Sequence, residues 1–253
     1  MMNNTHYVLL ACLLLSTACQ TKKPVEITDI ATDLPAVGPS PAQITEAQKA
    51  EGWVSLFDGK TMDGWRTFKN KENASWDVTD GSLHCKAFDD RKIKEQSDLL
   101  TVNQYQNFEL SLEWKVAPQS NTGVIYRCTE EFNEPYLSGP EYQIIDDIGY
   151  PGELKETNKA GGAYDMYVAK GKTLKPVGEW NATKIVVNGN HVEHWLNGVK
   201  VLEYEIGSAD WKKRKGSSKW NEARGYGAAA KGHIDLQDHG NEAWFRKILI
   251  RVL

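Results

Sequence analysis

The amino-acid sequence predicts an all-β fold in which two antiparallel sheets pack as a sandwich. Residues 108–116 alternate apolar and polar side chains over their whole length, which is typical of a half-buried antiparallel strand. Two Asn-Gly pairs, at residues 188–189 and 197–198, separate short strand-like runs and predict consecutive hairpins. No long amphipathic helical pattern interrupts these runs. About 200 residues of this kind suit one large sandwich better than two small ones.

The first residues indicate an export signal rather than part of the fold. Residues 7–15 form an apolar run too short to cross a membrane, and small residues precede Cys19. This pattern is typical of a bacterial lipoprotein signal peptide, residues 1–19, whose processing leaves Cys19 as the lipidated first residue. Cys12 is a second candidate, but cleavage there would leave about half the usual apolar length. We expect an exported protein, lipid-anchored to the bacterial membrane and periplasmic or at the surface; a plain secretory signal is the alternative.

A linker at residues 20–48 precedes the predicted domain at residues 49–253. The linker contains four prolines and lacks apolar periodicity, so it would hold the domain away from the membrane. Thr45 is a suitable N-cap for a short helix at residues 46–50. Further runs with strand character lie at 121–127, 139–147, 184–187, 191–196, 199–202, 231–240 and 244–253.

Composition and isolated motifs narrow the function classes. A formal net charge of −4 gives no reason to expect nucleic-acid binding, and the basic run at residues 212–215 predicts a solvated loop. Cys85 and Cys128 have no metal-type spacing, so they either pair or stay free and buried. His191 and His194 fall on opposite faces of a strand and do not share a metal ion. Both histidines are expected at the surface.

Residues 231–240, Lys-Gly-His-Ile-Asp-Leu-Gln-Asp-His-Gly, are the most informative stretch of the chain. Read as a strand, one face carries His233, Asp235, Gln237 and His239. The opposite face carries an isoleucine and a leucine that would seat the strand on a core. A solvated sheet face is the alternative for any single polar strand. Imidazole, carboxylate and amide groups together favour a site for a polar ligand.

Two further strands extend this polar face if they are its neighbours. In residues 139–147, Glu141 and Gln143 share a face, and Asp146 joins them only if a bulge turns it round. Residues 121–127 end in an arginine on the face of Ile125. The expected concave face is lined by Arg127, Glu141, Gln143, Gln237 and His239.

A series of short motifs runs in a fixed order from about Gly52 to Leu253. They lie at residues 56–60, 64–65, 76–78, 80–81, 105, 108–110, 121–127, 139–146, 162–165, 178–181, 195–198, 218–220, 232–234, 236–240 and 244–246. Together they resemble the 3-keto-disaccharide hydrolase family of exported bacterial proteins. The resemblance implies a concanavalin-like jelly roll, with a sugar site on its concave face. It also implies action on glycosides whose glucose-type ring is oxidised at C3.

One departure from the family concerns the loop that follows the Glu141 strand. This loop often carries a histidine and an acid in the family, whereas residues 149–152 read Gly-Tyr-Pro-Gly here. The resemblance therefore implies neither a base nor a metal ligand from this loop.

The implied substrate suggests a mechanism. A C3 ketone acidifies the hydrogen at C2, so a base can remove it, the group on C1 can leave, and water can add back. This route needs a base, an acid and donors for an enolate oxygen, but no carboxylates at glycosidase spacing. The expected catalytic residues are Glu141, His239 and Asp146, with the roles of base and acid left open. The expected substrate-binding residues are Arg127, Gln143, Gln237, Asp238, Tyr164 and Lys219.

The expected partners are an oligosaccharide or glycoside substrate and, through the lipid anchor alone, the membrane. Nucleic acid is not expected, and the sequence indicates no metal ligand. No cofactor is certain, and a divalent cation remains open. The alternatives are a non-catalytic carbohydrate-binding lipoprotein, an ordinary glycosidase, and a lyase that stops after elimination.

Overall fold

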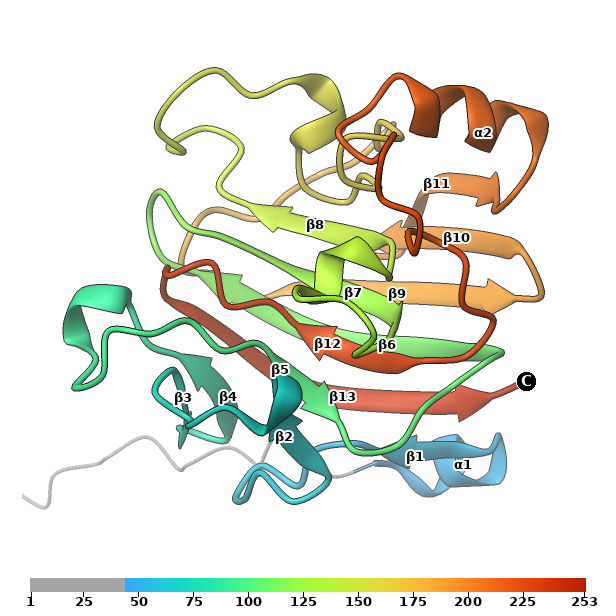
Figure 1. Cartoon of the computed structure of the whole chain (residues 1–253). Coiled ribbons are helices and arrows are strands. Elements are labelled where there is room, and N and C mark those ends of the chain that lie inside the picture. The colour runs from blue at the N-terminus through green and yellow to red at the C-terminus, as the bar shows by residue number, and fades with distance from the viewer. Residues whose placement is uncertain (1–43) are drawn as a thin grey trace, which may run out of the picture. The chain divides into compact units, whose positions relative to one another are not determined.

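The structure, a computed structural model, describes residues 44–253 and contains two antiparallel sheets (Figure 1). The larger sheet consists, in spatial order, of β11 (Val199–Glu205), β10 (His191–Leu196), β9 (Asn181–Asn188), β6 (Phe108–Val116), β13 (Ala243–Val252), β4 (Ser82–Cys85) and β3 (Trp76–Thr79), with β1 (Trp53–Ser55) paired to β13. The smaller sheet consists of β2 (Trp65–Thr67), β5 (Leu99–Thr101), β12 (His233–Leu236), β7 (Asn121–Cys128) and β8 (Glu141–Ile145). The predicted all-β jelly-roll sandwich is confirmed.

Short helices and turns complete the described chain. They are α1 (Glu46–Ala50), α2 (Ala209–Gly216), and the 3-10 turns η1 (Phe68–Asn70), η2 (Phe88–Asp90), η3 (Pro135–Leu137) and η4 (Glu156–Asn158). Thr45 caps α1 in a capping box with Gln48, as its position predicts. The helix begins inside the predicted linker. The predicted signal peptide, its Cys19 and the linker up to residue 43 lie outside the described residues.

The strands with the clearest sequence patterns are confirmed. Alternate residues of β6 are buried from Phe108 to Val116, because one face of the strand packs on the core. Strands β9, β10 and β11 form the two predicted hairpins. Asn197 and Gly198 both have positive φ, of 48° and 84°, which is the conformation that a tight hairpin turn requires.

The core lies between the two sheets and contains apolar residues from both. Leu110, Ile185 and Phe245 of the larger sheet and Val124 and Ile234 of the smaller sheet are fully buried. The opposite face of the smaller sheet has its own small apolar cluster, which consists of Phe68, Leu100, Ile125 and Cys128. This outer face of the smaller sheet is the polar face expected from the sequence, and it is called the concave face below.

The expected loop at residues 212–215 is wrong, because these residues belong to α2. The Ser208 hydroxyl caps the helix, and Asp210 lies in its first turn. Lys213, Arg214 and Lys215 lie in the last turn, where positive charge suits the helix dipole. The basic run is therefore a helix end. Among residues 44–253, no helix is both long and apolar enough to cross a membrane.

The expectation that His194 is a surface residue is also wrong. His194 shares a face of β10 with Val192 and Leu196, and all three are fully buried. Nδ1 donates to the carbonyl oxygen of Gly161 at 3.0 Å, and Nε2 lies 3.0 Å from the Tyr126 hydroxyl. Burial lowers the pKa of His194 to about 4, so this core histidine is neutral. His191 is partly exposed, as expected.

The two cysteines of the domain are both free and buried. Of the two alternatives from the sequence, the structure supports the unpaired one.

Candidate active site

Strand register brings the polar residues of β7, β8 and β12 together. Ile125 of β7 lies opposite Asp235 of β12 on one side and opposite Glu141 of β8 on the other. In the adjacent row, the Gln237 N–H donates to the Gly123 carbonyl oxygen at 3.0 Å, and Gly123 pairs with Gln143. Because side chains alternate along strands, these polar residues share the face opposite the core. The strand adjacency that the sequence left open is thus established.

The side chain of Glu141 lies over Gly123. A Cβ atom on Gly123 would approach Glu141 Oε1 to 2.4 Å, so only glycine leaves room for this carboxyl. Glu141 is 3% exposed. Burial raises the pKa of Glu141 to about 8; the charge of Lys219 opposes this rise and that of Asp98 adds to it. The carboxyl therefore holds its proton at neutral pH.

Lys219 extends a cation over the concave face from the loop after α2. Its Nζ lies 4.0 Å from the ring centroid of Tyr164, 4.3 Å from that of Trp220 and 5.8 Å from that of Tyr136. Burial lowers the pKa of Lys219, while the charge of Glu141 raises it. The predicted approach of Lys219 and Tyr164 from loops is found in the structure.

His239 stands just beyond β12, on the side of the site away from β8. Desolvation lowers the pKa of His239 below its usual 6.5; a backbone hydrogen bond opposes this shift, and the charge of Lys219 adds to it. The imidazole is therefore neutral at pH 7. His239 lines a cavity of about 280 Å³ together with Asp98, Gln237 and Tyr136.

A second cavity of about 290 Å³ lies on the β8 side. Gln143, Tyr150, Tyr164 and Lys219 are among its lining residues. The two cavities share no lining residue, and the carboxyl of Glu141 lies over the strand between them. The concave face therefore offers two neighbouring hollows with a protonated carboxyl between them.

The two predicted glutamines differ in how their amides are used. Gln143 is fully buried; its Nε2 donates to the Asn158 carbonyl oxygen at 3.2 Å, and its Oε1 accepts from the Ile144 N–H. Gln237 Oε1 is buried and has no hydrogen-bond partner within residues 44–253. Such an acceptor is normally satisfied by water or a ligand, which makes Gln237 the better candidate for binding a hydroxyl.

Two carboxyls of this face were not assigned a role from the sequence. Asp98 precedes β5 and accepts a hydrogen bond from the Asp238 N–H at 2.8 Å; burial raises its pKa to about 7. Asp235 is fully buried, and neither of its carboxyl oxygens has a partner in the described chain. Burial, with the charges of Asp98 and Glu141, raises the pKa of Asp235 well above its usual value. Asp235 could be recognised in the polar row of the sequence at residues 231–240. Asp98 is brought to this face only by the long-range pairing of β5 with β12.

Arg127 does not lie with the other predicted residues. A bulge pairs His233 with Cys128 and the next residue of β12 with Tyr126, so Arg127 is the extra residue, with φ of 53°. Its guanidinium donates to the carbonyl oxygens of Gln106, at 2.7 and 3.0 Å, and Gly189, at 2.7 Å. Strict alternation placed Arg127 on the concave face, and the bulge removes it.

Asp146 is likewise separate from the concave face, because no bulge turns it round. Its carboxylate accepts hydrogen bonds from the N–H groups of Gln119 at 2.9 Å, Gly149 at 2.8 Å and Ile148 at 3.2 Å. Burial alone would raise the pKa of Asp146, but these three donors lower it. The carboxylate borders an apolar cavity of about 440 Å³ near Trp114 and holds the loop after β8.

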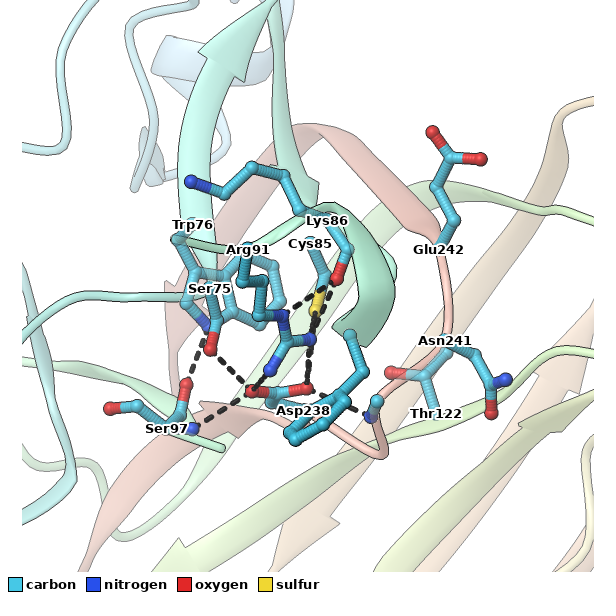
Figure 2. A network of polar contacts seen from close by, with 12 residues as sticks. Ser75, Trp76, Cys85, Lys86, Arg91, Ser97, Thr122, Asp238, Asn241 and Glu242 are labelled. Carbon is cyan, nitrogen blue, oxygen red and sulfur yellow. Dashed lines mark hydrogen bonds and ion pairs between the residues drawn. The ribbon is translucent and has the colours of Figure 1, made fainter. Parts of the chain in front are cut away.

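The Asp238 side chain is not available to a sugar. Its carboxylate is completely buried and pairs with both terminal nitrogens of Arg91, at 2.6 and 2.7 Å (Figure 2). Burial raises the pKa of Asp238, but the hydrogen bonds of Arg91, Ser75 and Ser97 outweigh this and lower it. The predicted binding role of this side chain is therefore corrected.

A potential metal site lies elsewhere. Within residues 44–253, one group of three closely spaced side chains could hold a metal ion: His191, Glu193 and Glu203 on the larger sheet. Lys200 Nζ already lies 3.2 Å from the Glu193 carboxylate and 2.5 Å from that of Glu203. This group is a partly exposed ion-pair network, so it does not identify a metal centre.

Comparison with known proteins identifies the family. A model of the 3-keto-alpha-glucoside-1,2-lyase-like domain matches residues 52–251. A 3-keto-disaccharide hydrolase from Bacteroides thetaiotaomicron is 33% identical over 230 residues, which cover 81% of this chain and 79% of that protein.

Solved structures agree with this match. The crystal structure of a proposed glycosyl hydrolase from Parabacteroides distasonis is 37% identical with a TM-score of 0.78, covering 84% of this chain and 99% of that one. A second proposed glycosyl hydrolase from that organism is 31% identical with a TM-score of 0.62, covering 79% of this chain and 99% of the other. The chain therefore belongs to the 3-keto-alpha-glucoside-1,2-lyase-like domain family.

Proposed function

We propose that this protein hydrolyses 3-keto-glycosides, including 3-keto-disaccharides, by elimination at C1 followed by addition of water. Membership of the family makes the chain an enzyme that acts on sugars. The observation that carries the finer proposal is the combination of a protonated Glu141, a neutral His239 and the cation of Lys219 at one concave face. These are the acid, the base and the enolate-stabilising charge that the route requires.

The environments of the two titrating groups assign their roles. His239 is neutral at pH 7, so it acts as the base that takes the C2 proton. The electron pair moves to the C3 oxygen, where the positive charge of Lys219 stabilises the enolate. The C3 carbonyl then re-forms, a C1–C2 double bond forms, and the bond from C1 to the leaving oxygen breaks. Glu141 donates its proton to that oxygen.

Addition of water reverses the same proton movements. The Glu141 carboxylate takes a proton from water while the water oxygen bonds to C1, and the imidazolium of His239 returns a proton to C2. One water molecule is consumed, a 3-keto sugar and an alcohol are formed, and both side chains regain their starting states. No oxocarbenium ion is formed, so a carboxylate pair at glycosidase spacing is not required.

The two hollows support a substrate with a group on each side of the cleaved bond. One hollow is lined by His239 and by Gln237, whose Oε1 has no partner within residues 44–253, and the other is lined by Tyr164 and Lys219. Gln237, Tyr164 and Lys219 are therefore the proposed substrate-binding residues.

Product analysis with a 3-keto-glucoside and its unoxidised parent tests this function. We expect release of the 3-keto sugar from the oxidised substrate alone. Cleavage of the parent would instead indicate an ordinary glycosidase, and binding without turnover would indicate a carbohydrate-binding module.

A lyase is the second candidate, because the family description names a 1,2-lyase-like domain. The lyase reaction differs from the proposed hydrolysis only in lacking the second step, the addition of water. Accumulation of an unsaturated keto sugar, with no incorporation of ¹⁸O from labelled water at C1, would assign the lyase.

A further inference from the structure

We propose that the buried Arg91–Asp238 ion pair positions Asp98 and His239 for catalysis. This inference rests on the proposed function, because it concerns the base of that reaction. It assigns a role to Arg91, which carried no motif in the sequence, and gives Asp238 a positioning role in place of the expected contact with sugar.

The ion pair is completely buried and fully hydrogen-bonded (Figure 2). Asp238 Oδ2 accepts from Arg91 Nη1 at 2.7 Å, from the Ser97 N–H at 2.8 Å and from the Ser75 hydroxyl at 2.5 Å. Asp238 Oδ1 accepts from Arg91 Nη2 at 2.6 Å and from the Gly240 N–H at 2.9 Å. The Asp238 carboxylate thus connects Ser75, Arg91 and Ser97 to its own segment, residues 238–240.

The guanidinium is tied to the chain on both sides of its own loop. Arg91 Nε donates to the Lys86 carbonyl oxygen at 3.0 Å, and Nη1 donates to the Glu95 carbonyl oxygen at 2.9 Å. Arg91 therefore closes residues 86–95 into a compact loop that leads directly into Asp98.

Asp98 and Asp238 are connected reciprocally. The Ser97 N–H donates to the Asp238 carboxylate, while the Asp238 N–H donates to Asp98 Oδ1 at 2.8 Å. Both contacts depend on where the Asp238 main chain and side chain lie. A shift of Asp238 would therefore move the Asp98 carboxyl, which acts on the pKa of Glu141.

His239 is fixed from both of its neighbours. On one side Asp238 is held by Arg91, and on the other the Gly240 N–H bonds to the same Asp238 carboxylate. Gly240 has φ of 84°, so the chain turns sharply directly after the imidazole. The ion pair thus sets the direction in which His239 leaves the sheet.

Stability alone is a weak reason for such a pair. Removing two charges from water is costly, and well-packed apolar side chains of similar volume often serve the fold equally well. Apolar side chains, however, would leave the N–H groups of Ser97 and Gly240 without this acceptor. The pair therefore holds Ser97 and Gly240, the chain neighbours of Asp98 and His239, in fixed positions.

Two substitutions separate position from charge. Arg91→Lys keeps the positive charge but loses the two-pronged contact, so we expect kcat to fall by about 10-fold or more with KM changed less than about threefold. Asp238→Asn keeps the shape but removes the negative charge, and we expect about a 10²-fold loss in kcat. Ile185→Ala, which opens a cavity in the larger sheet, controls for lost stability, and Ser75→Ala is the mild variant if the others fail to fold.

The pH profile distinguishes positioning from partial unfolding. The charge of Asp238 raises the pKa of His239 and that of Asp98, against the lowering effect of Lys219 on His239. Asp98 raises the pKa of Glu141, which Lys219 lowers, and Glu141 also faces the buried Asp235. In Asp238→Asn we therefore expect the acid limb of kcat/KM to move to lower pH. Unfolding would lower the whole profile without moving its limbs.

An NMR titration of the His239 imidazole provides a readout that does not need turnover. We expect a lower pKa of His239 in Asp238→Asn than in the wild type. An unchanged titration together with wild-type kcat in folded Arg91→Lys and Asp238→Asn would overturn the positioning role. An inactive wild type whose His239 titration still shifts would overturn the proposed function alone.

Discussion

At the residue scale, burial fixes the protonation state of Glu141, the proposed acid. Glu141 is buried and keeps its proton at neutral pH, whereas desolvation and the charge of Lys219 lower the pKa of His239, so its imidazole is neutral at pH 7. In water, by contrast, a glutamate side chain would be ionised at pH 7. The proposed assignment of acid and base, which the sequence alone left open, rests on these protonation states.

Replacing either group should remove most of the turnover. We expect Glu141→Gln and His239→Ala each to lower kcat by about 10²-fold or more, the usual scale for general acid–base groups. Wild-type kcat/KM should fall as pH drops through the lowered pKa of His239 and as pH rises through about 8, where Glu141 ionises. Steady-state kinetics from pH 5 to 10 check this. Full activity of both variants would sink the assignment.

Glu141→Gln should also change the pH dependence of stability. The pKa of Glu141 is about 8 in the folded protein against an ordinary 4.5, so between these values the unfolded state binds fewer protons. Stability from this group is therefore present below pH 4.5 and lost as pH rises through 8. Glutamine avoids this loss, so we expect the variant to exceed the wild type by about 2–4 kcal/mol at pH 9 in urea unfolding. Equal stability at that pH would contradict a buried carboxyl.

At the element scale, β7 shapes the site because it has a glycine, and therefore no side chain, at residue 123. Gly123 is the third of the eight residues of this strand, and the carboxyl of Glu141 from β8 occupies the space that a side chain there would take. A strand interior normally disfavours glycine, so a glycine there indicates a close approach of another group. β7 thus provides room for the Glu141 carboxyl and no reacting group of its own at this position.

Gly123→Ala tests this use of space. The new Cβ would lie 2.4 Å from Glu141 Oε1, so we expect the carboxyl to move, kcat to fall by about 10-fold or more, and stability to drop by about 1–3 kcal/mol. Gly216→Ala in α2 is the matched control, because its nearest neighbour would be Asn221 Oδ1 at 3.9 Å. That control should keep activity and stability. Kinetics and thermal unfolding of both variants measure the difference, and a fully active Gly123→Ala would exclude the steric argument.

The segment after α2 positions Lys219 through stacked aromatic rings. Trp220 stacks on Tyr226 at 4.5 Å, Tyr226 on Trp211 at 5.6 Å, and Trp211 on Tyr204 at 5.3 Å. This stack connects the loop to β11 at the edge of the larger sheet. Many of the aromatic residues therefore serve packing, and the cation they position serves the site.

At the scale of the whole molecule, the apolar core and the polar site lie on opposite faces of the smaller sheet. The larger sheet and the core residues of the smaller one form the apolar interior, while the outer face of the smaller sheet carries the polar groups. His194 is a polar residue in this interior, and both of its ring nitrogens have hydrogen-bond partners within the core.

Export and lipid anchoring remain a proposal for the chain as a whole. We expect incorporation of a labelled fatty acid and recovery in the membrane fraction for the wild type, and loss of both in Cys19→Ser, because Cys19 provides the thiol that is acylated. Cys12→Ser is the control and should behave like the wild type. Lipidation that persists in Cys19→Ser but disappears in Cys12→Ser would move the processing site.

The sequence by itself determined the sandwich and most of its strands. Alternation in residues 108–116 and the Asn-Gly turns are local signals, because side-chain period and turn chemistry act over a few residues. Thr45 and its short helix were found for the same reason. The family could also be predicted, since its motifs are local and keep their order.

Only the tertiary structure decided which polar residues meet. A one-residue bulge withdrew Arg127, backbone donors occupied Asp146, and Arg91 buried the Asp238 carboxylate. Asp98 reached the site through pairing across more than 130 positions of the chain. The protonation states of these groups could not be predicted from the sequence either, because desolvation depends on neighbours that are distant in sequence. Local pattern therefore set the elements, and long-range packing set the site.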